Sequence, residues 1–212
     1  MLFRSATLIF ARIWYPKPHE LEERSSDFLE TKGFPKTFWI YIVAGALIAA
    51  GFADFSLIAF HLKQSSNISD VQVALVYAVA MGAGAITNLG FGRLFDRWGF
   101  PVAAVAFLLG ALFAPFVFLG QFGLIVTGMV LWGIGMGAQN SLLKAMLADV
   151  ISASKRSTGF GLFYMVFGVG WFAGSALMGW LYTRSIIGLI GFSVLSQIAA
   201  LPVLFWGKAK AT

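Results

Sequence analysis

Long apolar runs alternate with short polar segments over most of the chain. At 1.5 Å per residue, a run of about 20 residues can cross the roughly 30 Å of hydrocarbon in a bilayer. Six runs reach this length, at residues 36–60, 71–92, 101–120, 122–148, 156–183 and 185–207. Backbone polar groups in lipid must be satisfied within a helix, and the alternation typical of membrane strands is missing. The pattern therefore predicts an all-α membrane protein with six transmembrane helices.

The N-terminal region does not fit this pattern. Residues 1–14 are apolar but too short to span a bilayer, and no small-residue cleavage site of a signal peptide follows them. We expect an interfacial helix here, or the tail of a helix whose start is missing. Residues 15–35 are polar and carry most of the acidic side chains. The predicted organisation is an N-terminal segment and linker (1–35), a six-helix domain (36–208) and a short cytoplasmic tail (209–212).

Composition supports a membrane environment. The chain is 59% hydrophobic and 11% charged, whereas soluble domains carry about 25% charged residues. Its net charge of +6 does not indicate a nucleic-acid partner, because the basic residues lie at the ends of apolar runs and not on one polar face. Cysteine is absent, which excludes disulfides and cysteine-based metal sites.

The basic residues also predict the orientation. With the N-terminus placed inside, 13 of the 15 Lys and Arg residues lie on the cytoplasmic side, and the outer loops hold only Lys63 and Arg184. The positive-inside rule therefore predicts a multi-pass protein of the cytoplasmic membrane with both termini cytoplasmic.

A charged segment from Gly92 to Gly99 separates the second and third runs and is expected to be a short cytoplasmic link. It reads Gly-x-Leu-x-Asp-Arg-x-Gly. Within a six-span topology this segment resembles the signature loop of the major facilitator superfamily. Phe100 and Pro101 stand where that family usually has basic residues. This weakened form is typical of the family's second half.

Other stretches carry the same resemblance over the whole chain. Residues 15–22 and 33–39 look like the central cytoplasmic loop of some prokaryotic members, and residues 51–55 and 132–139 look like parts of their helices. The resemblance implies the C-terminal half of a twelve-helix transporter, built from three-plus-three inverted repeats. Met1–Trp14 would then be the remnant of the sixth helix.

The resemblance implies mechanical roles for the signature loop. Asp96 would engage the positive N-terminal end of a helix in the opposite half and so act as a conformational latch. Arg97 would be its cytoplasmic charge partner, and Gly92 and Gly99 would be the turn residues. In a homodimer, Asp96 would engage the helix that begins near Ser157 of the other copy.

Two ionisable residues in the first span are candidates for function. Asp54 lies about two-thirds along the span, and a carboxylate at that depth is costly unless it faces the bundle interior or a water-filled cavity. It either couples transport to protons or binds a cationic substrate group, or it is a structural residue bonded to a neighbouring helix. His61, seven residues on, either relays a proton at the outer mouth or is a solvated helix cap.

The fourth and fifth spans carry further candidates. Gln139 and Asn140 are adjacent, about 100° apart on a helix, so we expect one to line a cavity and the other to bond a neighbouring helix. Gln139 is favoured for the cavity. Tyr164 and Trp171, with Phe167 between them, form an aromatic stripe. Such a stripe is more often a packing or lipid-facing surface, and if it lines a cavity it favours an amphipathic or hydrophobic substrate.

Small residues predict close helix packing. Gly133-x-x-x-Gly137 lies in the fourth span and Gly170-x-x-x-Gly174 in the fifth. Glycines at this spacing let helix backbones approach closely. Packing is the simpler interpretation, and the alternative is that these glycines let the helices rock during a transport cycle.

The sequence carries no catalytic triad, phosphate-binding loop or metal-ligand cluster, so we expect no enzyme activity, cofactor or metal. The expected partners are the lipid bilayer, an unidentified small-molecule substrate, and either a second six-helix half or a second copy of the chain. The leading hypothesis is a secondary transporter with or without proton coupling. The alternative is a non-transporting half or a membrane interaction protein with the same fold.

Overall fold

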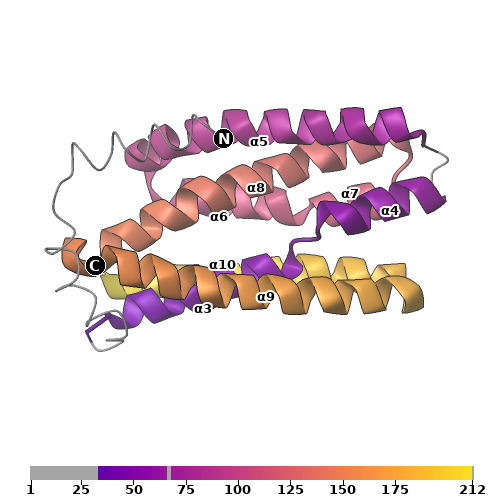
Figure 1. The fold of residues 1–212 in the computed structure, drawn as a ribbon. Coiled ribbons are helices and arrows are strands. Elements are labelled where there is room, and N and C mark those ends of the chain that lie inside the picture. The colour runs from indigo at the N-terminus through magenta and orange to yellow at the C-terminus, as the bar shows by residue number, and fades with distance from the viewer. Residues whose placement is uncertain (1–32, 66–67, 212) are drawn as a thin grey trace, which may run out of the picture. The chain divides into compact units, whose positions relative to one another are not determined.

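The computed structural model describes residues 33–65 and 68–211 of the 212-residue chain. The expected N-terminal segment and the linker up to Lys32 lie outside the described residues. Within the described ranges the regular elements are all helical, and Figure 1 shows their arrangement. They are α3 (Lys36–Gly51), α4 (Phe55–Ser65), α5 (Asp70–Trp98), α6 (Phe100–Ala111), α7 (Phe113–Leu119), α8 (Phe122–Val150), the 3-10 turn η2 (Ala153–Lys155), α9 (Arg156–Arg184) and α10 (Ile186–Ala211).

Six helical segments of the described residues are long and apolar enough to cross a membrane, which confirms the predicted number of spans. Two of the six are each built from two helices. The first span is α3 followed by α4, interrupted at Phe52–Asp54, and the third is α6 followed by α7, interrupted at Leu112. The other four spans are the single helices α5, α8, α9 and α10.

The segment Gly92–Gly99 is not the link that the sequence suggested. Helix α5 continues through it to Trp98, and Gly92 is an ordinary helical residue. The turn consists of Gly99 alone, whose φ of 66° lies in the left-handed region that favours glycine. The segment lacks proline, and its Arg, Leu, Phe and Trp residues all fit a helix, so the helix runs on past the apolar stretch.

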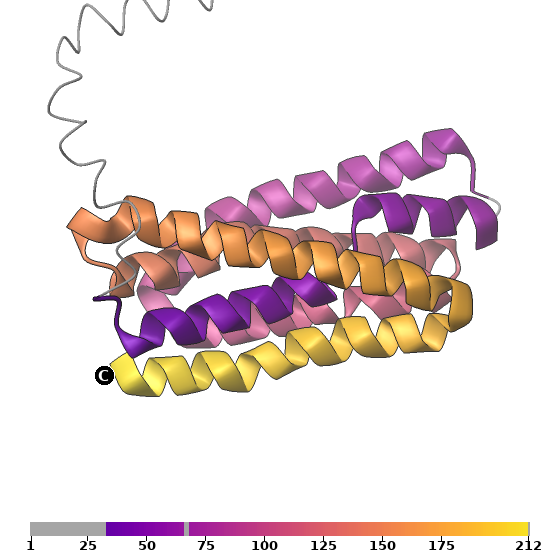
Figure 2. The same ribbon diagram turned by 60° about the horizontal axis from the view of Figure 1, so that its bottom comes forward.

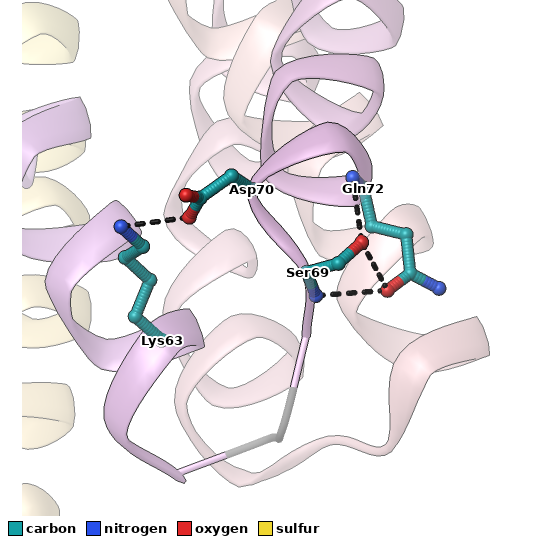
Figure 3. Close-up of polar contacts among 4 residues, drawn as sticks. All are labelled: Lys63, Ser69, Asp70 and Gln72. Carbon is teal, nitrogen blue, oxygen red and sulfur yellow. Dashed lines mark hydrogen bonds and ion pairs between the residues drawn. The ribbon is translucent and has the colours of Figure 1, made fainter.

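The start of α5 is defined by its own polar side chains, which Figure 3 shows. Ser69 and Gln72 form a capping box: the Gln72 backbone N–H donates to Ser69 Oγ at 3.3 Å, and the Ser69 N–H donates to Gln72 Oε1 at 2.9 Å. Lys63 near the end of α4 pairs with Asp70 at 2.7 Å. Both of these side chains are exposed, so the ion pair contributes little to stability.

The two ends of the bundle are named here after residues in their turns. The Gly99 end holds the start of α3, the α5–α6 turn, η2 and the end of α10. The Ser69 end holds the α4–α5, α7–α8 and α9–α10 connections. Between these ends α5 packs along α8, and α3 packs against α10 and α9, as Figures 1 and 2 show.

Small residues set the closest helix contacts. A Cβ added at Gly133 would meet the Ala80 carbonyl oxygen of α5, and one added at Gly174 would meet the Ala50 carbonyl oxygen of α3. A Cβ added at Gly137 or Gly170 would also come within 3 Å of a backbone oxygen of the same two helices. Both glycine pairs therefore bring helix backbones into direct contact, as the packing interpretation expects.

The spans differ strongly in how much of their surface this chain covers. In its most apolar window the α6–α7 span is 56% buried, whereas α5 is 22% buried and α9 only 11%. Large apolar side chains stand exposed along both helices, among them Leu75, Ile86, Val169 and Phe172. Helix α9 therefore packs through one narrow strip, which includes Gly170 and Gly174, and leaves most of its surface open.

We predict that Gly174→Ala destabilises the bundle, because its methyl group would meet the α3 backbone and force the helices apart. The expected cost is about 1–3 kcal/mol, measured as a lowered unfolding temperature in detergent. Gly179→Ala is the matched control on the same helix, since no atom lies within 4 Å of the added methyl. Equal unfolding temperatures for the two variants would contradict the packing role of Gly174.

Candidate functional site

The first span is broken in the middle of the apolar segment, at Phe52–Asp54. A helix break leaves backbone groups without their usual partners, and such groups are costly in hydrocarbon. Helix α10 supplies partners for the carbonyl of Gly51, which accepts from Ser193 Oγ at 2.6 Å and from Gln197 Nε2 at 3.1 Å. Ser193 and Gln197 are both buried. They therefore serve to hold the broken backbone in place.

A tryptophan of α8 holds the other side of the break. The Trp132 indole N–H donates to the Ala53 carbonyl at 2.9 Å, and the indole is buried. Its ring also stacks on Phe52, with centroids 5.3 Å apart and planes 18° apart. Trp132 therefore joins the break to the wall of α8 through both its polar and its apolar parts.

Two side-chain hydrogen bonds connect the outer part of the first span to α9. Asp54 Oδ2 accepts from Ser175 Oγ at 2.8 Å, and His61 Nδ1 lies 3.2 Å from the Tyr182 hydroxyl. The two residues of each pair are 121 positions apart in the sequence. The second bond therefore lies seven residues after the first on both segments, from Asp54 to His61 and from Ser175 to Tyr182. These two bonds are called the rungs below.

The rungs show what the two candidates contact. Asp54 is half-buried and accepts a hydrogen bond from a neighbouring helix, a contact compatible with both its structural and its functional interpretation. His61 is 3% exposed and also packs against Phe118, so the idea that it is a solvated cap is wrong. Neither residue lines the cavity that lies beside the break.

A cavity of about 130 Å³ lies beside the break. We call it the aromatic cavity, because five of its nine lining residues are aromatic. Its lining consists of Ala49, Phe52, Met136, Gln139, Asn140, Phe163, Tyr164, Phe167 and Trp171. The first span, α8 and α9 each contribute to this wall.

Both adjacent amides line the aromatic cavity. Gln139 is half-buried and Asn140 is exposed, and in the described part of the chain neither forms a hydrogen bond with another residue. The expectation that one of them bonds a neighbouring helix is therefore wrong. The cavity extends around α8 far enough to meet side chains 100° apart, so both amides face open space.

The aromatic stripe also lines the cavity. Phe163 is buried, whereas Tyr164 and Trp171 are 46% and 42% exposed. Edge contacts link the rings along α9: Phe163 lies 5.3 Å from Tyr164, and Phe167 lies 6.5 Å from Trp171, measured between centroids. Tyr164 and Trp171 are thus fixed by neighbouring rings while much of their own surface stays uncovered.

The signature segment, residues 92–99, lies at the Gly99 end of the bundle. It is also distant in sequence from the residues that line the aromatic cavity. Asp96 and Arg97 are exposed in the last turn of α5, and within residues 33–65 and 68–211 neither forms an ion pair. The Arg97 guanidinium instead lies 5.8 Å from the centre of the Trp98 ring. Asp96 is therefore available to a group outside the described chain.

Several residues of the site were missed from the sequence. Ser193 and Gln197 are four residues apart in an apolar run, a polar pair on one helix face that could have been noticed. Ser175 and Tyr182 carry no such signal, because their partners precede them by 121 residues. No cluster of three or more His, Asp or Glu side chains suited to a metal ion occurs among the described residues.

Comparison with known proteins identifies relatives over most of the chain. The family model described as Major Facilitator Superfamily matches residues 37–212. An uncharacterized protein of Mycobacterium tuberculosis is 34% identical over 171 residues, which cover 81% of this chain and 42% of the relative. The matched segment thus spans less than half the length of that relative.

Two further relatives carry transporter names. A protein of Cupriavidus pinatubonensis named a probable 4-methylmuconolactone transporter is 27% identical over 140 residues, covering 64% of this chain and 32% of the relative. An uncharacterized MFS-type transporter of Escherichia coli is 25% identical over 157 residues, covering 72% and 39%.

We predict that Trp132→Phe destabilises the site, because it leaves the buried Ala53 carbonyl without its indole donor while keeping an aromatic ring. The expected loss is about 1–3 kcal/mol of unfolding free energy, measured by denaturant unfolding in detergent. Trp180→Phe is the matched control, since Trp180 is 55% exposed. If both variants unfolded at the same denaturant concentration, the indole hydrogen bond would not support the break.

Proposed function

Because the chain belongs to the major facilitator superfamily and is a multi-pass membrane protein, we propose that it forms one half of a secondary transporter. Such a transporter moves a small molecule by alternating access between two six-helix halves, with the substrate near the bilayer midplane. The observation that carries the proposal is the aromatic cavity, which lies beside a broken span and is lined by two amides that bond no other described residue. No covalent chemistry is part of this function.

The need for a second half is supported by the exposed helices. Lipid should contact the most apolar surfaces, yet α5 and α9 are among the least apolar spans and α9 is the least buried. Contact with a partner surface and a water-filled path explains the low hydropathy of these exposed helices better than contact with lipid on all sides. The partial coverage of the relatives agrees, since the chain matches 42% of the length of one of them.

The second half is either a separate polypeptide or a second copy of this chain. In the second case, Asp96 engages the start of α9 in the other copy, where free backbone N–H groups favour a carboxylate. Both Asp96 and Ser157 belong to the Gly99 end of the bundle. The excess of basic residues at this end supports a cytoplasmic position for it, in a protein of the cytoplasmic membrane.

Proton coupling is assigned to Asp54. It is a half-buried carboxylate at membrane depth, and its described hydrogen-bond partner is the neutral Ser175. Protonation would remove the negative charge of this carboxyl, and a hydrogen bond to a neutral carboxyl is weaker than one to a carboxylate, so the Ser175 rung would weaken. His61 on the second rung lies further toward the Ser69 end, where a proton relay would enter.

We expect Asp54→Asn to abolish substrate accumulation driven by a pH gradient in proteoliposomes while leaving downhill equilibration. Radiolabelled 4-methylmuconolactone is the first substrate to test, after the name of one relative. Asp70→Asn is the control, because its carboxylate is exposed at the Ser69 end. Full gradient-driven accumulation by Asp54→Asn would refute the coupling role. Failure of the chain to move any substrate, alone or with a candidate second half, would favour a non-transporting membrane protein.

Self-pairing can be tested by disulfide crosslinking, since the natural chain contains no cysteine. Arg93→Cys, one turn before the intact Asp96 on α5, and Ser157→Cys are introduced into differently tagged copies, which are expressed together in membranes and oxidised. A homodimer predicts a crosslinked product that carries both tags. Lys63→Cys with Ser157→Cys is the control pair from opposite ends of the bundle. A doubly tagged product missing from the first pair would exclude the self-paired latch and favour a separately encoded half.

A further inference from the structure

We propose that the aromatic cavity receives an uncharged, flat, ring-shaped part of the transported molecule, with a polar edge against Gln139 and Asn140. This inference rests on the proposed function, because it names the substrate class of the same site. It concerns the part of the substrate that lies against this half of the transporter.

Charge is the first restriction on the substrate. None of the nine lining residues is charged, and the carboxylate of Asp54 lies outside the lining. A charged group placed against this wall would lose water without gaining an ion pair, which is unfavourable at membrane depth. The group that faces this wall is therefore uncharged.

Shape and size are restricted by the rings of α9. A cavity of about 150 Å³ with apolar walls accommodates one benzene molecule, and the aromatic cavity has about 130 Å³. Trp171 and Tyr164 keep roughly two-fifths or more of their surface uncovered, while Phe167 and Phe163 contact them edge to face. Rings fixed in this way favour a flat ring, which can stack on a face or meet an edge.

The two amides restrict the polar part of the ligand. Each offers two N–H donors and a carbonyl acceptor, and neither is occupied by another described residue. Apolar walls with a few convergent polar groups are typical of small-molecule sites. A carbonyl, hydroxyl or ring nitrogen on the edge of the ligand ring satisfies these amides, so a plain hydrocarbon is a poorer ligand.

The test uses phenol, cyclohexanol and benzoate, which share one six-membered ring and differ in flatness or charge. A Met136→Cys variant provides a unique thiol in the cavity wall, since the chain has no other cysteine. Its alkylation rate is measured in lipid nanodiscs with and without each compound. This readout reports occupancy of the cavity and not partition into lipid.

Phenol is expected to slow alkylation about threefold at twice its dissociation constant, as single-site occupancy requires. Cyclohexanol and benzoate at the same concentration should leave the rate unchanged. Adding Trp171→Leu or Gln139→Leu should raise the phenol concentration that gives the same slowing of alkylation about tenfold, equivalent to about 1.4 kcal/mol of binding free energy. Trp180 and Gln121 lie outside the lining. Trp180→Leu and Gln121→Leu should therefore leave this phenol concentration unchanged. An unchanged unfolding temperature in detergent serves as the check that each variant is folded.

Equal protection by benzoate or cyclohexanol, or no protection by phenol, would overturn the ring assignment. Binding is measured here without transport, so the two proposals can fail separately. Phenol protection in a protein that moves no substrate would contradict the transport function. Transport by a protein in which phenol gives no protection would contradict the substrate class alone.

Discussion

Satisfaction of the backbone in hydrocarbon is the constraint from which this structure follows. It explains why the described elements are helices, and it explains why the interruption of the first span needs specific side chains. Ser193 and Gln197 serve the Gly51 carbonyl, and Trp132 serves the Ala53 carbonyl. These partners come from α10 and α8, so the break depends on helices that follow it by about 80 to 145 residues.

Close packing through glycine complements these hydrogen bonds. Helix α9 meets the backbone of α3 at Gly170 and Gly174, and the Phe163 ring of the same helix packs against Gly45 of α3. The same helix therefore supplies both a tight contact and the ring-lined side of the cavity. This division explains how a helix with so little buried surface can still have a defined position in the bundle.

The sequence predicted the helical class, the six spans and the glycine contacts, because these depend on composition and on short periodic spacing. It failed at Gly92, which was assigned to a link, because a glycine at a membrane boundary can end a helix or continue in it. The break at Phe52–Asp54 contains no proline, and its partners are remote in sequence, so local patterns could not predict it. Gln139, Asn140, Tyr164 and Trp171 were identified as candidates, but their common cavity required the packing of three spans.

The equal spacing of the two rungs has a consequence for motion. Seven residues make nearly two helical turns, so Asp54 and His61 face the same side, as do Ser175 and Tyr182. Sliding α4 along α9 by one residue, about 1.5 Å, would put both hydrogen bonds out of register at once. The two rungs therefore resist sliding of the outer half of the first span together, and a shift that breaks one bond breaks the other as well.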